Sequence, residues 1–106
     1  MAWVLLAGAI VFEVFATSML KVSDGFSRLL PATAVVIGYV LSFGLLGLAL
    51  RTIGLGTAYA IWAGVGIIGT SIIAVLVFDE QLSLLAIVAI GLIVLGVVLL
   101  NIAVPH

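Results

Sequence analysis

Four long apolar stretches, separated by short polar links, dominate the pattern of this chain. They span residues 3–20, 31–50, 56–78 and 84–103. A helix that crosses a hydrocarbon core of ~30 Å needs about 20 residues, and each stretch is close to that length. Strands are disfavoured, because open sheet edges cannot face lipid and the stretches do not alternate apolar and polar residues. The pattern therefore predicts an all-α membrane protein, with a single domain of four transmembrane helices over residues 1–106.

The polar links carry every charged side chain except that of Glu13. In chain order these are Lys21, Asp24 and Arg28, then Arg51, then Asp79 and Glu80. Gly25 is the predicted turn residue of the first link. Pro31 is predicted to open the second helix, where its missing N–H costs nothing, and Ser83 to cap the fourth. Because the links are short, successive helices are expected to be antiparallel neighbours.

These charges leave the orientation in the membrane open. Lys21 and Arg28 fall on the opposite side from Arg51. A bias of two basic residues against one is a weak signal under the positive-inside rule. Two interpretations remain: insertion in one direction, or insertion in both directions to give two populations that pair antiparallel.

The composition excludes several function classes. The chain is 67% hydrophobic and 7% charged, whereas a soluble domain has roughly 25% charged residues. The absence of cysteine excludes thiolate metal sites and cysteine nucleophiles. A net charge of -1 offers no basic surface to nucleic acid. With neither a metal-ligand cluster nor a nucleophile–base pair, the sequence predicts a protein that is not an enzyme and has no cofactor.

Glu13 is the candidate functional residue, because it lies at mid-membrane depth in the first stretch. A charge there costs roughly 2.5–3.5 kcal/mol on insertion scales, and intramembrane acids mark ion and proton pathways. The alternative is a protonated carboxyl that only joins helices by hydrogen bonds. The residues that share its helical face are mostly small, which suits a close partner helix or a ligand cavity; they are Ala9, Ile10, Ala16 and Thr17.

A carboxylate in this position would bind either a proton or a cation. Loss of water disfavours the charged form, and an arriving cation stabilises it, so proton and cation compete for one site. Aromatic faces attract organic cations, and Tyr39, Tyr59 and Trp62 fall in the interior parts of the second and third stretches. Core packing is the alternative role for these rings. Ser42 is expected either to orient a carboxylate or to satisfy its own backbone.

Small residues suggest two further features. Gly64 and Gly66 lie inside the third stretch and permit a hinge, although tight packing is the alternative. Ala89 and Gly96 are seven residues apart in the fourth stretch, a spacing that suits a helix–helix seam between two subunits. Since three helices cannot easily enclose a polar pathway, two copies of the chain are expected.

Three segments resemble the small multidrug resistance family of transporters: residues 8–21 around Glu13, residues 24–29, and residues 56–66. The resemblance implies an antiparallel, asymmetric homodimer in the bacterial inner membrane that exports cations in exchange for protons. It implies that both copies of Glu13 bind protons or substrate. It also assigns the three aromatic residues and Ser42 to the substrate pocket, the two glycines to a kink, and the fourth-stretch spacing to the dimer seam, with Ala89 in place of a glycine.

The same resemblance separates two branches of the family. Guanidinium exporters have a glycine and a tryptophan flanking the glutamate, where this chain has Ile10 and Ala16, and Thr17 resembles the multidrug branch. The expected substrates are therefore hydrophobic and quaternary ammonium cations. The alternatives are a guanidinium or polyamine exporter, and a non-transporting membrane subunit of a heterodimer.

Overall fold

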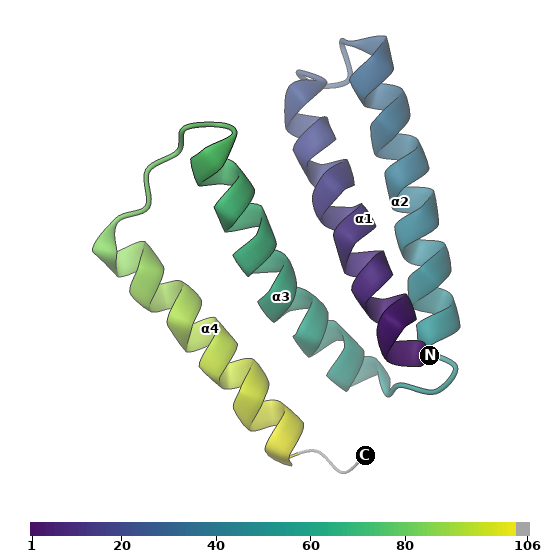
Figure 1. The fold of residues 1–106 in the computed structure, drawn as a ribbon, viewed down its shortest axis with the longest axis vertical. Coiled ribbons are helices and arrows are strands. Elements are labelled where there is room, and N and C mark those ends of the chain that lie inside the picture. Colours follow the sequence, from purple (N-terminus) through teal and green to yellow (C-terminus); the bar gives the residue numbers. More distant parts are fainter. Residues whose placement is uncertain (104–106) are drawn as a thin grey trace. The chain divides into compact units, whose positions relative to one another are not determined.

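The computed structural model describes residues 1–103 and confirms the all-α class. Its helices are α1 (Ala2–Val22), α2 (Leu29–Ala49), α3 (Leu55–Leu76) and α4 (Leu84–Ala103). All four are long and apolar enough to cross a membrane, and no strand occurs within residues 1–103. The chain divides into two compact units between Ile53 and Gly54, so that each unit is one helical hairpin (Figure 1).

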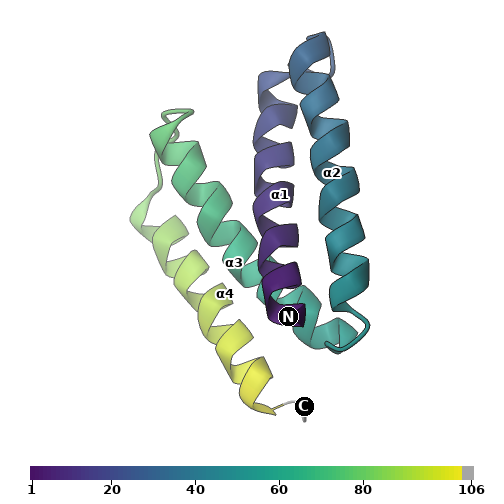
Figure 2. The same ribbon diagram turned by 45° about the vertical axis from the view of Figure 1, so that its right-hand side comes forward.

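The α1–α2 hairpin is closely packed along its length, as two views show (Figures 1 and 2). Its tightest point is Gly38 of α2, where an added Cβ would lie 2.8 Å from Ala16 Cβ and 3.4 Å from the Phe12 carbonyl oxygen. Ala9 and Ala16 of α1 are fully buried. Small residues at the contact let the two backbones approach closely, which is the usual basis of helix association in lipid.

Gly38→Ala is therefore expected to lower the free energy of unfolding by about 1–3 kcal/mol, because an added methyl group has no space. Gly47→Ala, on the same helix, is the matched control, since nothing lies within 4 Å of a Cβ there. Unfolding of detergent-solubilised protein, followed by circular dichroism, measures both variants. Equal stabilities would contradict the close approach at Gly38.

The first link is a compact turn built on Ser23. This buried side chain donates to the Leu20 carbonyl (2.7 Å) and accepts from the Phe26 N–H (3.1 Å). Gly25 has φ +69°, which confirms its predicted role as turn residue. α2 begins at Leu29, before Pro31 and not at it as predicted. Pro31 still fits, because the N–H groups of the whole first turn have no partner within the helix.

The α3–α4 hairpin is joined by a wider turn. α3 ends at Leu76, two residues before the predicted end, because the chain turns through Asp79 with φ +55° and the Glu80 N–H donates to the Ala74 carbonyl at 2.9 Å. Ser83 caps α4 as predicted, accepting from the Ala86 N–H at 3.1 Å. No residue of α4 is fully buried, so most of its apolar surface is left for lipid or another protein.

Candidate functional site

Glu13 lies near the middle of α1, where its side chain is half-buried. Helical periodicity places Ala9 one turn before it and Thr17 one turn after it. Of the neighbours predicted to share its face, Ala9 and Ile10 are buried and Thr17 is half-buried. The acid therefore stands among small and apolar side chains of its own helix, with one hydroxyl a turn away.

Thr17 is joined to Tyr39 of α2 by a hydrogen bond of 2.8 Å between the two hydroxyl oxygens. The Tyr39 ring is stacked on that of Phe43, with centroids 6.2 Å apart. The hydrogen bond fixes the tilt of the tyrosine ring against α1. Two of the predicted site residues, far apart in the sequence, are thus brought together one turn from Glu13.

The hydrogen-bond partner of Ser42 is neither a carboxylate nor the backbone of its own helix, the two partners that the sequence suggested. Its fully buried hydroxyl donates to the carbonyl oxygen of Ala9 at 2.7 Å, across the hairpin. In an α-helix that carbonyl also accepts the N–H of the residue four positions on, which is Glu13. Ser42 therefore holds the backbone turn that carries the acid. The sequence could not indicate this contact, because it depends on how α1 and α2 are rotated against each other.

The remaining predicted aromatic residues lie on α3, in the second unit. Tyr59 is 71% exposed and Trp62 is half-buried. Three residues apart, they share one face of the helix. Gly64 and Gly66 follow on the same helix, and both are buried. The rest of the α3–α4 hairpin therefore leaves most of the Tyr59 ring uncovered.

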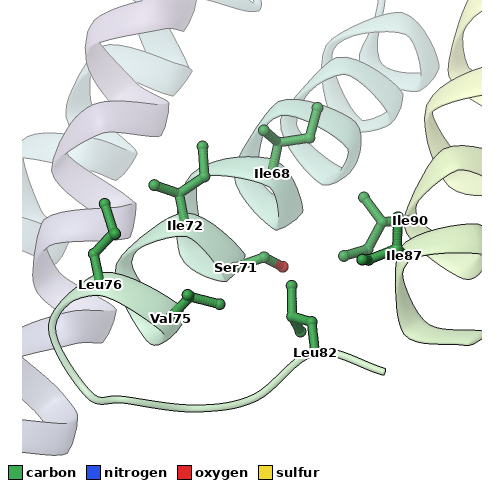
Figure 3. A pocket seen from close by; sticks show the side chains of 8 residues that line it. All are labelled: Ile68, Ser71, Ile72, Val75, Leu76, Leu82, Ile87 and Ile90. Atoms are coloured by element: carbon green, nitrogen blue, oxygen red, sulfur yellow. The ribbon is translucent and has the colours of Figure 1, made fainter. Parts of the chain in front are cut away.

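A cavity within the α3–α4 hairpin was not predicted. It has a volume of about 370 Å³ and lies between the second half of α3, the linking segment and the first half of α4 (Figure 3). Seven of its eight lining side chains are aliphatic, and Ser71 is the exception; the others are Ile68, Ile72, Val75, Leu76, Leu82, Ile87 and Ile90. None of the predicted site residues lines it. It has no group that could bind a proton or neutralise a cation.

Comparison with known proteins identifies the family. The family model described as "Small Multidrug Resistance protein" matches residues 1–93. The chain belongs to the small multidrug resistance family. The quaternary ammonium compound-resistance protein QacF of Klebsiella aerogenes is 50% identical over 99 residues, which cover 93% of this chain and 90% of QacF. QacE of Escherichia coli is 48% identical with the same coverage. The multidrug resistance protein EbrB of Bacillus subtilis is 44% identical over 101 residues, 95% of this chain and 86% of EbrB.

Membership of the small multidrug resistance family confirms the resemblance seen in the sequence. Four membrane-spanning helices and these bacterial relatives make the chain a multi-pass bacterial membrane protein. The family model and these relatives are named for resistance to drugs and quaternary ammonium compounds, so the chain is classed with drug efflux transporters and not with enzymes. Within residues 1–103, no three His, Cys, Asp or Glu side chains are grouped so that they could hold a metal ion.

Proposed function

We propose that this small multidrug resistance protein is a proton-coupled antiporter that exports hydrophobic and quaternary ammonium cations. The observation that carries the proposal is the position of Glu13, half-buried at the middle of a membrane helix, one turn from the bonded hydroxyls of Thr17 and Tyr39. The printed names of relatives such as QacF and QacE support this substrate class. Ile10 and Ala16 beside the acid are consistent with it.

The coupling follows from the chemistry of one acid in a medium that contains little water. An ionised carboxyl there needs compensation, which either a proton or an organic cation supplies. The two ligands therefore exclude each other at Glu13. A site that exchanges one for the other and opens to each side in turn moves the cation out as protons move in. Tyr39, Tyr59 and Trp62 would bind the apolar, cationic part of the substrate through their ring faces.

The active unit is an antiparallel homodimer, in which both copies of Glu13 serve one site. α4 supports this arrangement, since Ala89 and Gly96 are both exposed and face outward from the hairpin. Small residues on an exposed apolar face let a second helix approach closely. The basic residues of the links, two on one side and one on the other, are compatible with insertion in both directions.

Binding of tetraphenylphosphonium, titrated across pH with purified protein in lipid, tests the proposal. The affinity is expected to fall as the pH falls, because protons then occupy the carboxyl. Cation addition at neutral pH is expected to release protons into a weakly buffered solution. Affinity that does not vary with pH would reject competition at Glu13. Uptake of guanidinium but not of tetraphenylphosphonium by proteoliposomes would favour the guanidinium or polyamine exporter, and no cation binding by the isolated chain would favour a heterodimer subunit.

A further inference from the structure

α4 contacts α3 directly at Gly64. A Cβ built at this glycine would lie 2.9 Å from Val97 Cγ2, 3.4 Å from Val97 Cβ and 3.6 Å from Val97 Cγ1. The branched end of Val97 therefore occupies the space that a side chain at position 64 would need. Gly66 differs, because the nearest such atom is Trp62 Cδ1 at 3.8 Å. Only the first glycine of the predicted hinge is in contact with α4.

The half-buried residues of α4 recur at helical spacing, and they include Ile90, Val94, Val97 and Asn101. These residues form the face of α4 that packs on α3. Ala89 and Gly96 are exposed and belong to a different face. Gly96 and Val97 are adjacent in sequence and point about 100° apart around the helix axis, so one turn of α4 presents both the proposed dimer seam and the hinge contact, on neighbouring faces.

The aliphatic cavity lies on the side of the linking segment, between residues 68–76 of α3 and the start of α4 (Figure 3). An open, aliphatic groove therefore lies next to the second half of α3, whereas the Val97 side chain lies against the backbone at Gly64. A bend that begins at Gly64 can move the second half of α3 into this space.

We propose that Val97 is a positioning residue that couples the bend of α3 to the subunit seam on α4; this rests on the proposed transport function. Valine has one strongly preferred side-chain rotamer in a helix, so it cannot easily rotate away from Gly64. A bend of α3 at Gly64 must therefore displace α4 through Val97. A displacement of α4 at the subunit seam must likewise be transmitted through Val97 to Gly64. Packed side chains with a discrete fit transmit such shifts, whereas loose contacts absorb them.

A double-mutant cycle tests this inference. In the proposed dimer the two subunits differ in the bend of α3 and exchange these two shapes as the site opens to each side in turn. Gly64→Ala is expected to slow this exchange about tenfold, measured by NMR in lipid bicelles, because the new methyl group meets Val97. Adding Val97→Ala to this variant removes both Cγ atoms, and the exchange rate is expected to return to within about threefold of the native rate. Binding of tetraphenylphosphonium, measured on the same samples, is expected to stay close to native.

Val98→Ala is the matched control, since Val98 is the next residue of α4 and is exposed. It is expected to leave the slow exchange of Gly64→Ala unchanged. If Val97→Ala and Val98→Ala both restored the exchange rate of Gly64→Ala, or if neither did, the proposed role of Val97 would be wrong. The exchange measurement needs no transport, so a protein that fails to export cations would disprove the proposed function while the cycle still decides the coupling.

If the Gly64→Ala protein cannot be produced in the membrane, Val97→Ala alone, without the glycine substitution, tests the coupling. Loss of the contact is expected to change the exchange rate several-fold, with Val98→Ala again as the silent control. An exchange rate that equals the native one in Val97→Ala would reject the coupling. Circular dichroism and a monodisperse elution profile establish that each variant is folded.

Discussion

Glu13→Gln is expected to abolish coupled transport while the protein still folds. Glutamine has nearly the shape of glutamate but cannot ionise, so it neither releases a proton nor compensates a cation. Removing one partner of a desolvated charge pair costs roughly 2–5 kcal/mol, so the affinity for tetraphenylphosphonium is expected to fall by at least about thirtyfold. Proton release on cation addition and proton-driven uptake into proteoliposomes measure the two losses separately.

The matched control is Glu80→Gln, which makes the same chemical change at an exposed acid of the link between α3 and α4. It is expected to preserve cation-driven proton release. Glu13→Asp keeps the acid but shortens its reach, and it is expected to retain proton release with weaker cation binding. Native proton release from Glu13→Gln would show that another group exchanges the proton, and the mechanism would then be wrong.

Trp62→Ala is expected to weaken the binding of aromatic and quaternary ammonium cations about thirtyfold, since a desolvated cation–π contact contributes ≈ 2 kcal/mol. Trp62→Phe retains a ring and is expected to fall between this variant and the native protein. Isothermal titration in lipid nanodiscs at one fixed pH, high enough to keep Glu13 deprotonated, isolates the aromatic contribution from proton competition.

Trp3→Ala is the control for the loss of an indole ring. Trp3 lies at the start of α1, where it is 55% exposed and suited to the membrane interface. It is expected to leave the affinity unchanged. Equal losses from Trp3→Ala and Trp62→Ala would indicate a general effect on folding or insertion, and they would remove the support for Trp62 as a binding residue.

The four helices of this chain follow from its sequence because hydropathy is a property of each residue taken separately. Lipid requires a continuous apolar run of about 20 residues and allows almost no charge within it, so four spans and the exceptional Glu13 can be read directly. The helix ends do not follow from hydropathy alone. α2 begins before Pro31 and α3 ends at Leu76, because local hydrogen bonds decide the ends, such as that from the Glu80 N–H to the Ala74 carbonyl.

The role of Ser42 shows where sequence reasoning fails. A serine in an apolar helix must satisfy its hydroxyl, and the nearest acceptors by sequence are carbonyls of its own helix or a nearby carboxylate. The structure instead joins it to Ala9 of α1 at 2.7 Å. The rotation of two helices about their axes decides that partner, and the composition of α2 carries little information about rotation.

The sequence by itself determined that this chain crosses the membrane as four helices, that one acid lies at depth within it, and that the chain resembles the small multidrug resistance family. These conclusions need only the order of residue types, because lipid is an external solvent that acts on every residue in the same way. The tertiary structure decided the contacts between helices: Thr17 with Tyr39, Ala16 against Gly38, Val97 against Gly64, and the aliphatic cavity. Apolar helices associate in lipid through close packing and a few hydrogen bonds. Close packing depends on the shapes of two helix surfaces together, so it does not follow from the residue types of either helix alone.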